Sequence, residues 1–160
     1  MNLALIIAVL VSMLPLSQKE RKVWCVIQPL VTTRNEVDAL LGRPTSGADN
    51  FFSYDTKDEH ISVWFGNGKP NQADPCKWKV EKNIVFVYIV APKNKLLLSE
   101  ADIDLTQFKK ENDFHGVNSF YYHNEDSGIT ISTRIRAGEE VIESIHRDPK
   151  LVDRQKFCPH

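Results

Sequence analysis

The chain has 160 residues, of which 20 are Lys or Arg and 21 are Asp or Glu, so its formal net charge at pH 7 is −1. This length is enough for one hydrophobic core, and we expect one domain. Two observations exclude a nucleic-acid-binding surface. The net charge is near zero, and the short lysine clusters at Lys93/Lys95 and Lys109/Lys110 are flanked by acidic or apolar residues.

The N-terminal segment from Leu3 to Leu16 is almost continuously apolar. It is shorter than the about 20 residues that a helix needs to span a bilayer, but it suits the apolar part of a signal peptide. We expect residues 1–17 to be a signal peptide cleaved after Ser17, and residues 18–160 to be a periplasmic or secreted domain. An uncleaved N-terminal membrane anchor is the alternative, because no basic residue precedes the apolar run while several lie in residues 19–22.

Three cysteines, Cys25, Cys76 and Cys158, allow one disulfide bond and leave one thiol. In an oxidising compartment we expect the Cys76–Cys158 pair, because Cys76 lies in a loop rich in Gly and Pro and the bond would fasten the C-terminus. Cys25, between Trp24 and Val26, is expected to be a buried core thiol. No metal site is expected, since the cysteines and the five histidines lack the close spacing of ligand pairs.

The first predicted element is a short helix that begins at Thr33, where Thr33 and Glu36 match a capping box, and ends at Gly42. Residues 45–50 are predicted to be a turn-rich connection. A β-hairpin follows over residues 51–65, because apolar and polar residues alternate on both sides of a turn at residues 56–58.

The continuous apolar run over residues 84–90 predicts a strand buried on both faces. Residues 99–110 are predicted to be a helical or irregular segment, in which Ser99 and Asp102 match a second capping box. Three further strands are predicted at residues 120–124, 129–135 and 141–146.

The order helix, strand, strand, strand thus occurs twice along the chain. It predicts an α+β domain with short helices packed on one face of an antiparallel sheet, built from two similar helix-plus-hairpin halves at about residues 24–95 and 96–160. The alternative is two unrelated antiparallel meanders, since short strands resemble one another easily.

A set of residues spread over the chain matches a pattern found in exported bacterial proteins. They are Trp24, Ile27, Pro29, Leu30, Thr33, Arg34, Val37, Leu40, Leu41, Gly42, Pro44, Cys76, Trp78, Val80, Pro92, Lys93, Leu96 to Ser99 and Cys158. Through them the chain resembles an uncharacterised family of exported proteins, which implies a small periplasmic or secreted domain and no particular activity. The unit from Thr33 to Phe65 is similar to the SmpA/OmlA outer-membrane assembly lipoproteins and to β-lactamase-inhibitor-type repeat domains. The lipoproteins carry a lipidated cysteine, for which this chain has no suitable residue.

No motif in the chain specifies a reaction. No two histidines have the helical spacing of a zinc hydrolase, no serine lies in a nucleophile elbow, and the glycines at residues 66–68 do not precede a phosphate-binding helix. Catalytic residues, cofactors and metals are therefore not expected. A small periplasmic enzyme, whose site is assembled only in the fold, is the alternative.

The predicted strands contain more aromatic residues than one buried sheet face needs. They are Phe52, Tyr54, Trp64, Tyr88, Tyr121 and Tyr122. Those that lie on the face away from the helices would form a surface for an envelope or secreted protein partner. The sequence therefore predicts a non-catalytic interaction or structural module of the cell envelope.

Overall fold

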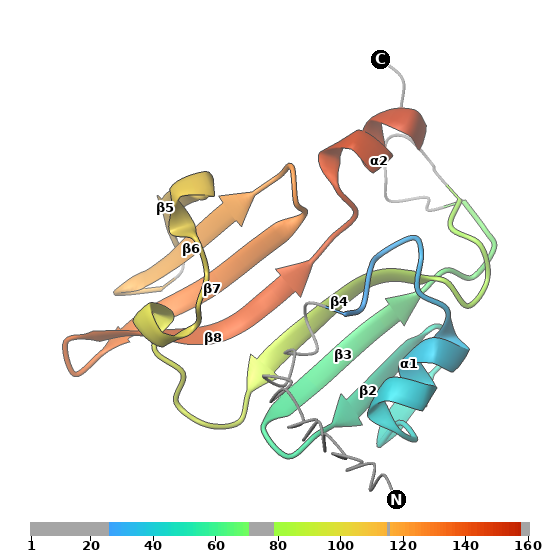
Figure 1. Ribbon diagram of the computed structural model, residues 1–160, viewed down its shortest axis with the longest axis horizontal. Coiled ribbons are helices and arrows are strands. Elements are labelled where there is room, and N and C mark those ends of the chain that lie inside the picture. The colour runs from blue at the N-terminus through green and yellow to red at the C-terminus, as the bar shows by residue number, and fades with distance from the viewer. Residues whose placement is uncertain (1–25, 71–78, 115, 158–160) are drawn as a thin grey trace, which may run out of the picture.

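The computed structural model describes residues 26–70, 79–114 and 116–157. Across these ranges the strands form one 8-stranded antiparallel sheet in the order β1-β2-β3-β4-β8-β7-β6-β5 (Figure 1). The strands are β1 (Ser46–Ala48), β2 (Phe51–Asp55), β3 (Glu59–Phe65), β4 (Val85–Pro92), β5 (Lys109–Asn112), β6 (Ser119–Asn124), β7 (Ile129–Arg136) and β8 (Glu139–Arg147). The helices are α1 (Arg34–Leu41) and α2 (Leu151–Phe157). The predicted antiparallel sheet is present, but the fold is mainly β with short helices, so α+β describes it only loosely.

The local signals of the first half give the structure that they predict. The capping box at the start of α1 is formed: the Thr33 N–H donates to Glu36 Oε2 (2.7 Å), and the Glu36 N–H donates to Thr33 Oγ1 (3.3 Å). Helix α1 ends at Gly42, whose φ of 83° is unstrained only for glycine. Strands β2 and β3 form the predicted hairpin around residues 56–58.

The chain between β4 and β5 differs from the prediction. It contains only two short 3-10 turns, Leu98–Glu100 and Leu105–Gln107, and no side chain caps the first of them, so the predicted capping box at Ser99 is wrong. Apolar side chains of this segment pack against the sheet, and these tertiary contacts fix the chain without a regular helix. Strand β5 begins at Lys109, within the segment predicted to be helical or irregular.

Burial in β4 alternates, so the prediction of a strand buried on both faces is wrong. Tyr88 and Val90 are fully buried, whereas Ile89 between them is partly exposed. A continuous run of apolar residues does not distinguish these two cases, because it fits a strand with one half-exposed apolar face equally well.

The sheet consists of two meanders, β1 to β4 and β5 to β8, joined where β4 pairs with β8. Three residue pairs form this junction: Tyr88 with Arg147, Ile89 with His146, and Val90 with Ile145. The first meander carries a buried cluster of Ile27, Val37, Tyr54, Ile61, Val63, Phe65, Val85, Tyr88 and Val90. The second carries a cluster of Leu98, Ala101, Tyr122, Ile131, Ile142 and Ile145. Since Val90 and Ile145 are directly opposite each other, both clusters lie on the same face of the sheet, here called the core face.

Candidate functional site

The six aromatic residues predicted to bind a partner do not lie together. Tyr54 and Tyr88 are fully buried, Tyr122 is 7% exposed, and Phe52 packs against the first cluster. These four lie on the core face, where three are buried and Phe52 is partly exposed. Trp64 and Tyr121 lie on the opposite face, because strand side chains alternate between faces.

The face opposite the core face is here called the outer face. Its central residues are all half-buried except Ser53, which is buried, and they are Phe51, Ser53, Ser62, Trp64, Val87, Ile89, Tyr121, Thr130, Ser132, Ser144 and His146. The half-buried state of Phe51, Val87 and Ile89 could have been predicted from the alternation with buried neighbours, but the sequence prediction did not include these residues.

An apolar group occupies the outer face of the first meander. The ring centroids of Phe51 and Trp64 are 4.7 Å apart. Trp64 is directly opposite Val87 on β4, and Ser62 of β3 is directly opposite Ile89. The four apolar side chains Phe51, Trp64, Val87 and Ile89 therefore lie on neighbouring positions of this face and are only partly exposed to solvent.

The outer face of the second meander is polar but uncharged in its centre. Ser144 Oγ lies 3.1 Å from His146 Nε2, and His123 Nδ1 lies 3.1 Å from Thr130 Oγ1. Burial lowers the pKa of His146, and the negative charge of Asp148 only partly opposes this effect. His146 is therefore neutral at pH 7, and the row across the middle of this face presents hydroxyl and imidazole groups.

The Ser144–His146 contact is the arrangement in the described chain most similar to a nucleophile and its base. The two residues are neighbours on one face of a single strand, where such a contact is ordinary. A hydrolytic site also needs a group that orients the other ring nitrogen of the histidine. No ion pair between His146 and a carboxylate occurs within the described residues.

The core face contains buried polar groups whose role is structural. The Tyr54 hydroxyl donates to Asp38 Oδ1 (2.7 Å), and the Tyr122 hydroxyl donates to Glu140 Oε1 (2.9 Å). Burial raises the pKa of both tyrosines, and the neighbouring carboxylates raise it further. Thr133 Oγ1 also donates to Glu140 (2.7 Å). These bonds satisfy hydroxyl groups that would otherwise be buried without partners.

Cys25, Cys76 and Cys158 lie outside the described residues, so the disulfide bond stays a prediction. Among the residues that are described, no group of three or more His, Cys, Asp or Glu side chains could hold a metal ion. In the same part of the chain, no helix has the length and apolar character needed to cross a membrane.

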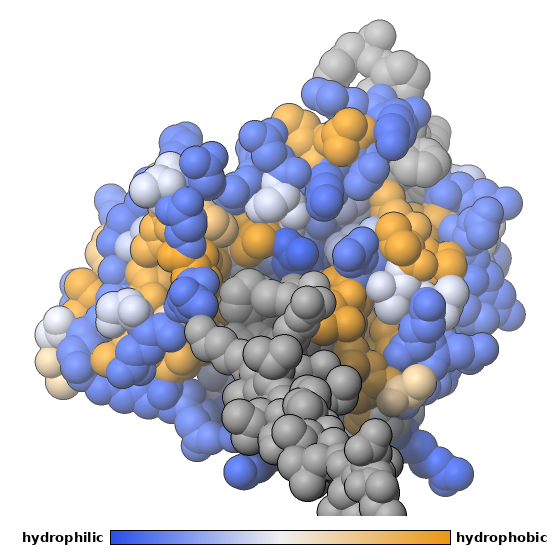
Figure 2. All heavy atoms as spheres, in the orientation of Figure 1, coloured by the Kyte–Doolittle hydropathy of each residue, from blue (hydrophilic) through white to orange (hydrophobic). Residues whose placement is uncertain are grey.

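The space-filling view, in the orientation of Figure 1, mixes hydrophilic and hydrophobic residues (Figure 2). The hydrophobic residues visible there lie in groups between hydrophilic residues. No protein-family model, no curated protein and no solved structure matches the chain. The resemblance to exported bacterial proteins therefore stays a prediction from the sequence.

Proposed function

We propose that the protein is an exported, non-catalytic interaction module that binds an envelope or secreted partner protein through its outer face. The observation that carries this proposal is the group of half-buried apolar residues, Phe51, Trp64, Val87 and Ile89, on the face opposite both buried clusters. In the isolated chain these apolar side chains remain partly exposed to water, and a partner would complete their burial.

The chemistry of the outer face indicates the kind of partner. The aromatic pair Phe51 and Trp64 provides rigid anchors, which commonly carry much of the binding energy of an interface. The hydroxyl and imidazole groups around His146 add hydrogen-bonding capacity without charge. The complementary surface is therefore a protein face with an apolar centre and uncharged polar groups at its side.

Location belongs to the same proposal. The apolar segment from Leu3 to Leu16 acts as a signal peptide, and Cys76 with Cys158 forms a disulfide bond after export. The intact mass of the protein from fractionated native cells, with alkylation before and after reduction, tests both. We expect a periplasmic or secreted species trimmed near Ser17 that has one free thiol. A full-length cytoplasmic species with three free thiols would overturn this part of the proposal.

The finer architecture that we propose is a pair of similar halves whose helical segments pack on the core face. The register supports it: Tyr54 pairs with Ile61, which pairs with Val90, and Tyr122 pairs with Ile131, which pairs with Ile145. In each half, the residue before the first helical turn also forms an isolated antiparallel bridge, with the residue that precedes β4 in the first half and with a residue of β8 in the second. These contacts are the bridges of Thr33 with Ile84 and of Leu97 with Val141.

Site-specific photo-crosslinking in native cells tests the binding surface. A photoreactive phenylalanine analogue replaces Tyr121 on the outer face, and a matched control replaces Val152, which is 53% exposed on α2. We expect one discrete protein adduct from position 121 and none from position 152. When Trp64→Asp is added to the protein with the analogue at position 121, we expect the adduct to be lost. An unchanged circular dichroism spectrum would show that this variant is still folded. Equal labelling from both positions, or an adduct that Trp64→Asp leaves intact, would show that the outer face does not bind a partner.

The enzyme alternative rests on the Ser144–His146 contact of 3.1 Å. A fluorophosphonate probe reacts with activated serines, so it distinguishes the two functions directly. We expect no labelling of Ser144, because its histidine lacks an orienting partner among the described residues. Labelling that Ser144→Ala removes would favour the enzyme.

A further inference from the structure

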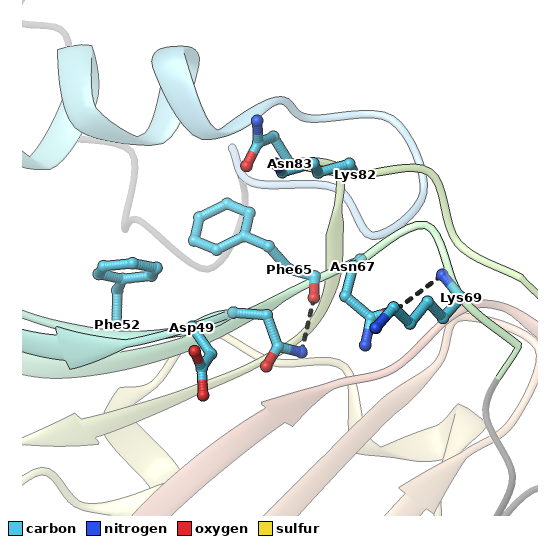
Figure 3. Close-up of a pocket in the computed structure, with 9 residues that line it drawn as sticks. Asp49, Phe52, Phe65, Asn67, Lys69, Lys82 and Asn83 are labelled. Carbon is cyan, nitrogen blue, oxygen red and sulfur yellow. Dashed lines mark hydrogen bonds between the residues drawn. The ribbon is translucent and has the colours of Figure 1, made fainter.

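A hollow of about 480 Å³ lies at one end of the first meander (Figure 3). Three chain segments line it: the β1–β2 turn with Asp49 and Asn50, the chain that follows β3 with Asn67 and Lys69, and the chain before β4, residues 82–83. A volume of this size is typical of a site for a small molecule. Its apolar lining comes from Phe65, which belongs to the first buried cluster, and from Phe52, which packs against that cluster.

The walls of the hollow are held by backbone contacts. The Gly66 N–H donates to the Ile84 carbonyl oxygen (2.7 Å), and the Asn83 N–H donates to the Gly66 carbonyl oxygen (3.0 Å). A Cβ atom at Gly66 would collide with the Glu81 carbonyl oxygen, so the two segments approach as closely as only glycine permits. On the opposite wall, Asn50 Nδ2 donates to the Phe65 carbonyl oxygen (3.0 Å). The site is therefore preorganised.

Two of the polar side chains that line the hollow, Asn50 and Asn67, form hydrogen bonds with the backbone of Phe65 and Lys69, and the other four are exposed. Most other lysines of the sheet region and α2 form an ion pair: Lys93, Lys95, Lys109, Lys110 and Lys156. Among the described residues, no hydrogen bond or ion pair involves the ammonium groups of Lys69 and Lys82 or the side chains of Asp49 and Asn83. Two cations and two oxygen-bearing side chains, all exposed to solvent, thus line one space and are available to a ligand.

The hollow has a negatively charged residue on one side and positively charged residues on others. Asp49 and Lys69 lie on opposite sides of Phe65, and Lys82 and Asn83 come from the segment above it (Figure 3). Ammonium groups bind phosphate or carboxylate, whereas a carboxylate and amides accept and donate hydrogen bonds with hydroxyl and amino groups. The apolar edges of Phe52 and Phe65, whose ring centroids are 6.0 Å apart, complete the lining.

We propose that this hollow binds a small anionic sugar, namely a sugar or amino sugar that carries a phosphate or carboxylate group. Lys69 and Lys82 hold the anionic group. Asp49 and Asn83 bind the hydroxyl or amino groups at the other end of the ligand. The proposal does not depend on the outer face or on export.

Isothermal titration of the full-length protein with four probes tests the ligand class: glucosamine 6-phosphate, glucose 6-phosphate, glucosamine and inorganic phosphate. We expect saturable binding of both sugar phosphates. Glucosamine and inorganic phosphate are each expected to bind at least about tenfold more weakly, because each lacks one of the two groups that the hollow recognises. No saturable binding of either sugar phosphate would overturn the proposal. Equal binding of inorganic phosphate would reduce the site to a simple anion site and would overturn the sugar assignment.

Paired lysine variants locate the binding. The double variant Lys69→Ala/Lys82→Ala is expected to weaken glucose 6-phosphate about 100-fold, since each charge-assisted hydrogen bond accounts for about tenfold. The matched control is Lys57→Ala/Lys150→Ala, which removes two exposed lysines elsewhere and is expected to change nothing. Asp49→Asn is expected to remove any preference for the amino sugar over glucose 6-phosphate. Equal losses in the two lysine variants would show that binding is nonspecific and would refute the site.

Discussion

Two isoleucines at the β4–β8 junction allow a direct test of which face of the sheet is buried. Ile145 is 1% exposed and belongs to the second buried cluster, whereas Ile89 lies one residue pair away on the outer face and is partly exposed. Both side chains are identical and lie in adjacent rungs of the same ladder. The same substitution at the two positions therefore compares the two faces with backbone and composition held constant.

The expected cost of Ile145→Ala follows from its burial. The substitution removes three carbon atoms at about 0.8 kcal/mol each, and the cavity that remains raises the total to about 3–4 kcal/mol. Ile89→Ala removes the same atoms from a site that solvent already reaches, so about 1 kcal/mol is expected. The difference between the two variants, about 2–3 kcal/mol, measures how much less the outer face is packed than the core face.

Urea unfolding followed by far-ultraviolet circular dichroism measures both costs. The midpoint is expected to fall much further for Ile145→Ala than for Ile89→Ala, with the slope of the transition unchanged in both. Equal and large costs would show that the outer face is as tightly covered as the core face. Such a result would refute the reasoning that leaves this face available to a partner.

Two further predictions concern the helix cap and a histidine. Thr33→Ala removes the cap of α1 and is expected to lower the free energy of unfolding by about 1 kcal/mol in the same assay, with Thr56→Ala as the control outside any helix. Burial lowers the pKa of His146 in the folded chain, so the unfolded chain binds more protons as the pH falls through about 6.5, the ordinary pKa of histidine. The free energy of unfolding is therefore expected to decrease as the pH falls from neutrality through this value. His146→Gln should weaken that decrease, and an unchanged pH profile would contradict the assigned shift.

Elements with strong local signals could be predicted from the sequence, and elements fixed by pairing could not. Helix α1 has a capping box, and the β2–β3 hairpin has regular alternation around a turn. Strand β1 consists of three exposed residues, Ser-Gly-Ala, and exists because its backbone pairs with β2. Helix α2 was also missed. Short edge elements of this kind carry little apolar periodicity from which they could be recognised.

The aromatic residues show why a binding face is difficult to predict. The sequence similarity of the two hairpins aligns Phe120 with Phe51, because both are the first aromatic residue of their strand. The strand register instead aligns Phe120 with Phe52. Phe52 is directly opposite Val63 and Phe120 is directly opposite Thr133, and all four residues lie on the core face. A shift of one residue moves a side chain to the opposite face, so a count of aromatic residues cannot say which of them are available.

The difference between the two meanders explains where the ligand hollow lies. In the second meander, β7 and β8 are joined by a tight turn at Ala137 and Gly138, whose φ values are 52° and 82°. The equivalent connection in the first meander, between β3 and β4, spans residues 66–84, and its described parts supply most of the lining of the hollow. Long connections on a fixed sheet are where proteins commonly gain binding sites, because they vary without disturbing the core. If the chain consists of two similar halves, the long β3–β4 connection gives the first half the proposed site. The β7–β8 turn of the second half is too short to form an equivalent one.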